Sequence, residues 1–432
     1  MADFRLDTRN FLNSLSKEEL ITRLMALQKH LFSMRENGPD SNMDKISQLR
    51  HLKKQKYQKP IIWSEQKFIK VALKFAYLGA DFNGLQIQTA TANTVESHIW
   101  RAILVSKLRP DENMPGEFYS RCARTDKGVS AFQNVLTIEL RSKGSNGENG
   151  PDKENEYDYV TMLNAILPND IRILSWAKID ENFDSRHNCI YRTYQYIFPV
   201  TKDLDLSNME SACQKLIGCH DYRNFCKINL STAKTHVRRI LEARIITGEN
   251  ENSSQNTAIL EISSTGFLYH QIRLTMTILL QIGLGNENID VIDELLDIEK
   301  NPRRPQYHMA NDLPLILTEC KFEAFSKAKV LEDDVDKEKP HHALNKQDLL
   351  SKNYKLNWKI SSHAKELLTK SLRKNWFEKA MLFNQVEILL KIADIDIFDK
   401  EIFKLISKDF HVKKHVRGTL IIDHRSWAIV CT

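Results

Sequence analysis

The stretch YSRCARTDKGVSA, residues 119–131, places one carboxylate, Asp126, among three cations, Arg121, Arg124 and Lys127. Nearby cations favour the ionised form of an aspartate, which is the form that a nucleophile or a general base needs. Gly128 permits a sharp turn that projects Asp126 out of the fold. The same stretch is also typical of an ordinary charged turn between two strands, so the neighbouring segments have to be considered with it.

A second stretch, YRTYQYI at residues 191–197, has the pattern of an aromatic strand. Alternate side chains of a strand point the same way, so Arg192 and Tyr194 share a face. A tyrosine beside an arginine can stack on a nucleic-acid base while the arginine meets a phosphate. The alternative is a strand that belongs to an aromatic core.

A third stretch, GFLYHQIRL at residues 266–274, sets Arg273 in an apolar segment. Its pattern predicts a helix over residues 267–284. A buried arginine needs a carboxylate or a phosphate as its partner, and Asp126 is the candidate. The alternative is an arginine whose long stem reaches the surface.

Taken together and in this order, the three stretches resemble the TruA family of tRNA pseudouridine synthases. The family signature G-R-T-D-x-G-V-H-A is matched by residues 123–131, its R-x-Y-x-Y strand by residues 192–196, and its F-L-x-x-x-V-R segment by residues 267–273. The resemblance covers about residues 68–322. Weaker matches, including Tyr77 and Gly84, support it.

The chain departs from the family pattern at two positions of the signature. Ala123 replaces the usual glycine, and Ser130 stands where many bacterial members have histidine. The eukaryotic members are similar to this chain at the second position. Within the family, residues 75–79, 224–227 and 304–312 resemble eukaryotic members that modify positions 38 and 39 of the tRNA anticodon stem-loop.

The resemblance implies an α+β fold of two halves, with mixed or antiparallel sheets flanked by helices and a cleft between the halves. It implies isomerisation of uridine to pseudouridine without a cofactor or a metal, catalysed by Asp126, Tyr194 and Arg273. Arg273 would pair with Asp126, Tyr194 would stack on the base, and Arg124 would fill the space that the extruded base leaves. Two roles stay open for Asp126: attack on the sugar, or abstraction of a proton. The predicted substrate-binding residues are Arg121, Arg124, Lys127 and Arg192.

The family resemblance also implies two partners, the anticodon stem-loop of tRNA and a second copy of the chain in a homodimer. Three alternatives stay open. The first is a related synthase that modifies other tRNA positions, and the second is a tRNA-binding protein with a silent active site. The third is a scaffold that binds partners through its terminal helices.

The chain divides into four predicted regions. The first, residues 1–66, holds an amphipathic helix, which begins with a capping box at residues 16–19, and a basic linker. The second and third, residues 67–200 and 201–325, are the halves of the catalytic domain. The fourth, residues 326–432, is a charged linker followed by a mainly helical extension. The basic run at residues 51–59 is typical of a phosphate-contacting arm, of a weak nuclear signal or of a solvated linker. We therefore expect the protein in the nucleus and the cytoplasm.

Composition and charge exclude several classes of protein. The chain has 432 residues, 42% hydrophobic, and no apolar run long enough for a membrane helix. Its N-terminus lacks the apolar segment of a signal peptide. The net charge of +6 lies mostly in residues 1–60, which hold 12 basic and 7 acidic residues. Seven scattered cysteines form no disulfide framework, and the spacing of Cys213, Cys219 and Cys226 matches no common zinc site, so we expect no metal.

Overall fold

The computed structural model describes residues 61–110, 118–144, 156–228, 235–247, 257–323, 354–375 and 379, and the backbone of two short strands further on. The chain splits into two compact units, one of Met1–Gln66 with Ala380–Ile397 and one of Lys67–Lys379 with Phe398–Thr432. The predicted N-terminal helix, the basic run and the charged linker lie outside the described residues. Apart from the turn Trp63–Glu65, everything below belongs to the second unit.

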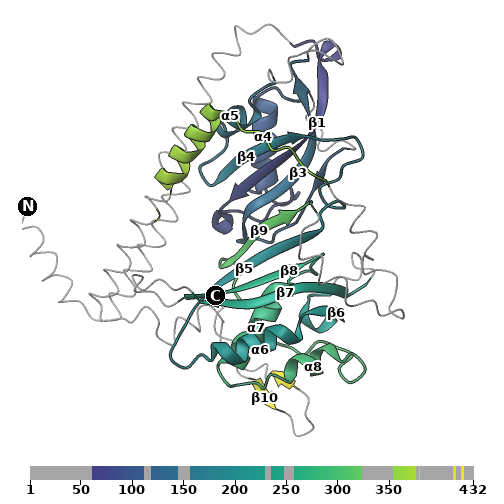
Figure 1. Ribbon diagram of the computed structural model, residues 1–432, viewed down its shortest axis with the longest axis vertical. Coiled ribbons are helices and arrows are strands. Elements are labelled where there is room, and N and C mark those ends of the chain that lie inside the picture. Colours follow the sequence, from purple (N-terminus) through teal and green to yellow (C-terminus); the bar gives the residue numbers. More distant parts are fainter. Residues whose placement is uncertain are drawn as a thin grey trace, which may run out of the picture. The chain divides into compact units, whose positions relative to one another are not determined.

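A nine-stranded sheet organises this unit, with the strand order β4-β1-β3-β9-β5-β8-β7-β6 and β2 paired to β3 (Figure 1). Among the described strands of this sheet, every pairing is antiparallel except β3 with β9, which is parallel. The strands are β1 Lys67–Tyr77, β2 Ser120–Arg121, β3 Ser130–Ser142, β4 Ile171–Lys178, β5 Tyr191–Pro199, β6 Gly218–Asp221, β7 Val237–Thr247, β8 Thr257–Ser264 and β9 Leu315–Lys321. The sheet is therefore mixed, which confirms the α+β prediction.

The last strand of the sheet in chain order, β9, joins its two halves. One edge of β9 pairs with β3, which follows the Asp126 stretch, and the other edge pairs with β5, which carries Tyr194 (Figure 1). The halves consequently share one continuous sheet. The expectation of mixed or antiparallel sheets in two halves did not include how the halves are joined. The reason is that a strand from the end of the domain inserts between them, and strand patterns in a sequence do not show which strands will pair.

Between residues 95 and 296 of the described part, five short and medium helices accompany the sheet. Helix α4, Val95–Val105, begins at Thr94, whose hydroxyl accepts a hydrogen bond from the Ser97 amide at 3.3 Å. All thirteen residues of α7, Gln271–Gly283, are buried, and α7 packs beside α6, which also packs on β7. A helix that is buried on every side belongs in a core, and Arg273 is one of the polar residues that α7 buries there. The helices are α4, α5 Tyr159–Asn164, α6 Leu206–Lys215, α7 and α8 Val291–Leu296.

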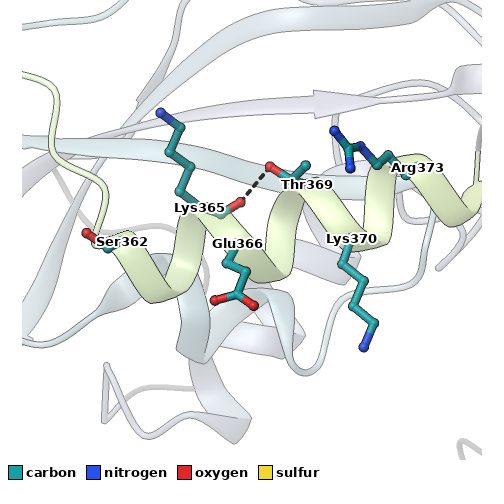
Figure 2. A pocket seen from close by; sticks show the side chains of 6 residues that line it. All are labelled: Ser362, Lys365, Glu366, Thr369, Lys370 and Arg373. Carbon is teal, nitrogen blue, oxygen red and sulfur yellow. Dashed lines mark hydrogen bonds between the residues drawn. The ribbon is translucent and has the colours of Figure 1, made fainter.

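The described part of the C-terminal extension covers the edge of the sheet. Lys359 makes a two-hydrogen-bond bridge with Trp176 of the edge strand β4, and Arg172 of β4 donates to Ser371 at 2.7 and 2.9 Å. Residues 362–375 are helical. An exposed strand edge is prone to unwanted pairing, and this segment blocks it. Figure 2 shows a pocket along one face of this helix, lined by Ser362, Lys365, Glu366, Thr369, Lys370 and Arg373.

Two further short strands, β10 Val412–Lys414 and β11 Leu420–Ile422, form an antiparallel hairpin of their own. In the part of the chain that the structure describes, no helix has the length and apolar character that crossing a membrane requires.

Candidate active site

Asp126 lies on a loop, residues 122–129, that connects β2 to β3. The loop is fastened at Thr125, whose buried hydroxyl hydrogen-bonds the Tyr77 hydroxyl at 2.6 Å. A second pair of hydrogen bonds holds the loop at Ala123. The Asn134 side-chain NH2 donates to the Ala123 carbonyl at 3.1 Å, and the Ala123 backbone N–H donates to Asn134 Oδ1 at 3.3 Å. Thr125 is buried, whereas the side chain of Asp126 keeps 31% of its surface exposed. The backbone is thus held while the carboxylate stays accessible.

A second segment, residues 79–85, supports this loop from behind. Gly84 has φ +92°, and a Cβ there would lie 3.0 Å from the Thr125 carbonyl oxygen. At Gly79 a Cβ would lie 2.1 Å from the Val129 carbonyl oxygen, so only glycine fits. The Gly79 amide donates to the Ser130 hydroxyl at 2.9 Å. Ser130, one of the two departures from the family pattern, therefore has a structural role here.

Three side chains face Asp126 from the second half of the domain. The nearest is His270, whose Nε2 lies 3.5 Å from Asp126 Oδ2. Arg273, on the first turn of α7, and Asp312 act on it through their charges. Burial raises the pKa of Asp126, the positive charge of Arg273 lowers it, and the negative charge of Asp312 raises it, with a net increase.

Arg273 makes its ion pair with Asp312 and not with Asp126. Among the described residues, the one carboxylate within 4 Å of its guanidinium is that of Asp312, 3.8 Å from Nη2 to Oδ2, and Nε donates to the Ala310 carbonyl at 2.7 Å. The expected contact pair with Asp126 is absent in this arrangement. Arg273 nevertheless lies close enough to favour the ionised carboxylate of Asp126 through space.

Tyr194 is buried in β5, with its ring packed edge to face on Phe267 at a centroid distance of 5.2 Å. Burial raises the pKa of its hydroxyl well above the ordinary value. The segment 267–273 thus contacts Tyr194 at its start, through Phe267, and faces Asp126 at His270. This one segment therefore carries Arg273 and lies next to the other two predicted catalytic residues, Tyr194 and Asp126.

The predicted substrate-binding cations fall into two groups. Arg124 and Lys127 are exposed next to Asp126. Desolvation and the positive charges of Arg121 and Arg186 lower the pKa of Arg124, and the negative charge of Glu96 raises it, so three guanidinium groups and one carboxylate gather here. Such a cluster favours an anion.

The other two cations make contacts within the protein. Arg121 forms an ion pair with the buried Glu96. Arg192 is 91% buried, and it donates to the carbonyl oxygens of Cys122, Thr265 and Arg186 at 2.9–3.2 Å. Its guanidinium therefore fastens three backbone segments together, and we do not assign it to a phosphate.

Sequence reasoning missed four residues of this site: Glu96, Arg186, His270 and Asp312. His270 has φ +63°, a left-handed conformation that is uncommon for histidine and that turns the chain into α7. This turn also explains why α7 begins at Gln271 and not at the predicted residue 267. Position 270 carried one local signal, a histidine three residues before the arginine that we had singled out.

The comparisons with known proteins identify the family of the chain. A family model described as tRNA pseudouridine synthase matches residues 212–323, which include Arg273 and Asp312. The tRNA pseudouridine(38/39) synthase of Bos taurus is 40% identical over 333 residues, 73% of this chain and 68% of the relative. The enzymes of the same name from Mus musculus and Saccharomyces cerevisiae are each 37% identical, over 71% of this chain and 67% and 71% of their own lengths. On this evidence, the chain belongs to the tRNA pseudouridine synthase family, whose members are isomerases.

Proposed function

We propose that this chain converts uridine to pseudouridine at positions 38 and 39 of the anticodon stem-loop of tRNA, and that Asp126 starts the reaction. The observation that carries the proposal is the placement of Asp126: a partly exposed carboxylate on a fastened loop, opposite His270 and Arg273. The names of the relatives support the two positions.

The reaction is a rearrangement in which no atom is gained or lost. The bond between the ribose C1′ and the base N1 breaks, the base turns, and C1′ bonds to C5; the proton on C5 leaves and N1 gains one. Asp126 must be ionised either to attack the ribose or to remove a proton. Burial opposes ionisation and Arg273 favours it, so Arg273 acts as the positioning and charge-stabilising residue.

Binding has to bring a stacked base out of the stem, which costs a few kcal/mol. We propose that exposed Arg124 occupies the vacated space and contacts phosphate, together with Lys127 and Arg186. Tyr194 contributes the flat aromatic surface of the base pocket. We propose that the RNA enters a cleft between the halves of the domain, that two copies of the chain form a homodimer, and that the enzyme acts in the nucleus and the cytoplasm.

The test is position-resolved mapping of pseudouridine on an unmodified tRNA transcript with uridines at 38 and 39. Wild type, Asp126→Asn and Asp180→Asn are compared, because Asp180 is an exposed aspartate away from the site. We expect product at both positions from wild type and Asp180→Asn and none from Asp126→Asn, with tRNA binding retained by all three. Product at other positions would refute the assignment of 38 and 39, and full activity of Asp126→Asn would refute the role of Asp126.

A further inference from the structure

Three cysteines that are far apart in the sequence meet behind the active site. Cys122 is the first residue of the Asp126 loop, Cys189 lies two residues before β5, and Cys320 lies in β9. Their sulfur atoms all lie within 4.8 Å of one another, and all three are free thiols. Cys122 and Cys189 are 97% and 98% buried, and Cys320 is partly exposed. None of these thiols is used in the proposed reaction.

The geometry suits a metal ion that binds sulfur. Zinc–sulfur bonds of about 2.3 Å in a tetrahedral site place neighbouring sulfurs about 3.8 Å apart. The observed limit of 4.8 Å therefore requires movements of about 1 Å or less. Thiolates select soft or borderline ions such as zinc or monovalent copper. Zinc also takes a fourth ligand, and the three thiols leave that position open.

The charge at this point favours a divalent ion. Three thiolates around a divalent ion leave one negative charge. Arg192, buried and bonded to the Cys122 carbonyl through Nε and Nη2, supplies one positive charge beside the cluster. A monovalent ion would leave a further buried charge without compensation, which is unfavourable.

We propose that Cys122, Cys189 and Cys320 form a binding site for one zinc ion, which ties the start of the Asp126 loop to β5 and β9. The role is structural. The ion would join the two halves of the domain at the strand, β9, through which they share a sheet. The proposal does not depend on the RNA substrate or on the reaction.

The competing explanation is simple packing. Cys122 and Cys189 belong to a small apolar cluster with Ala72, Val135, Phe183 and Phe322, and Cys320 packs against it. Reduced cysteines behave as small apolar side chains in such places. Packing needs no convergence of the three sulfurs on one point, and it predicts no affinity for a metal, so the two explanations give opposite results in a metal titration.

The first experiment uses the full-length wild-type protein. Its metal content is measured by elemental analysis, and the metal-free, reduced protein is then titrated with cobalt(II), which reports thiolate ligation by charge-transfer absorption. We expect one zinc per chain, a cobalt–thiolate spectrum that saturates at one equivalent, displacement of cobalt by zinc, and a higher melting temperature with zinc. No stoichiometric metal together with no thiolate spectrum would overturn the proposal, as would a disulfide among the three cysteines in the protein isolated without reductant.

The second experiment places the site on these residues. Cys122→Ser, Cys189→Ser and Cys320→Ser should each weaken cobalt binding by at least about tenfold, since even loss of an outer-shell partner costs 10- to 100-fold. Cys213→Ser is the matched control, because Cys213 is fully buried in α6 and outside the cluster. Equal weakening by Cys213→Ser would overturn the assignment. If a cluster variant fails to fold, the wild-type titration still decides.

Discussion

The hydrogen bond between Tyr77 and Thr125 allows the positioning of Asp126 to be tested separately from its chemical role. Tyr77→Phe removes one hydroxyl from β1 and leaves the Thr125 hydroxyl without its partner at 2.6 Å, one residue before Asp126. Both residues are buried, Tyr77 to 98% and Thr125 to 92%. An unpaired buried hydroxyl costs about 1–3 kcal/mol, and we expect a loss of unfolding free energy in that range.

The variant should also lose activity, because the Asp126 loop loses its fastening. Small misplacements of reacting groups cost up to about 100-fold in rate, so we expect single-turnover pseudouridine formation to fall by about tenfold or more. Tyr307→Phe is the matched control, since the Tyr307 hydroxyl donates to the Asn224 carbonyl at 2.6 Å in another part of the domain. It should lose similar stability and keep its rate.

Two measurements decide this prediction: urea unfolding for stability, and single-turnover kinetics with tRNA at saturating enzyme. If Tyr77→Phe turned over tRNA as fast as Tyr307→Phe at equal loss of stability, the hydrogen bond would be a packing feature alone. The reasoning that links the loop to catalysis would then be refuted.

Four further predictions follow from the same site. Gly79→Ala should abolish most activity and destabilise the fold, because its Cβ would lie 2.1 Å from the Val129 carbonyl oxygen. Gly266→Ala should do neither, because a Cβ there meets no atom within 4 Å. Thermal melting and turnover check both variants. Asp126→Asn should stabilise the protein at neutral pH. Burial raises the pKa of Asp126 in the folded state, so the ionised carboxylate of the wild type favours unfolding, and asparagine removes that effect. The gain in melting temperature should shrink as the pH falls toward about 4, where the aspartate of the unfolded chain is also protonated. Asp312→Asn removes a charge that raises the pKa of Asp126, so the acid limb of the rate profile should move to lower pH, and an unmoved limb would contradict the coupling. Arg124→Gln should reduce the slope of log affinity for tRNA against log salt by about 0.7–0.9, the value for one phosphate contact, and an unchanged slope would remove Arg124 from the interface.

Local patterns predicted much of the secondary structure. The apolar alternation at residues 68–77 and the aromatic run at 191–200 correspond to β1 and β5, and the position of the Asp126 turn before a strand corresponds to the start of β3. These features depend on side-chain periodicity within a few residues, which a sequence displays directly.

Features that depend on distant residues were not predictable in this way. The insertion of β9 between β3 and β5 joins residues more than a hundred positions apart. The same holds for the meeting of Cys122, Cys189 and Cys320, and for the choice of Asp312 as the partner of Arg273. We expected Arg273 to need a carboxylate or a phosphate and named Asp126 as the candidate. The ion pair is with Asp312 instead, because spacing gives no means of choosing between the two aspartates.

The way in which Arg273 is held bears on how Asp126 can react. Its Nε is fixed by the Ala310 carbonyl and its Nη2 faces Asp312, so the guanidinium acts on Asp126 through its field. A guanidinium in bidentate contact would occupy both oxygens of Asp126, and those oxygens are the atoms that must reach the ribose or a proton. An arginine anchored on Asp312 favours the ionised form and leaves the oxygens free. Removing Asp312 should therefore do more than shift a pKa, because it releases Arg273 to move onto Asp126 and block the group that it now supports.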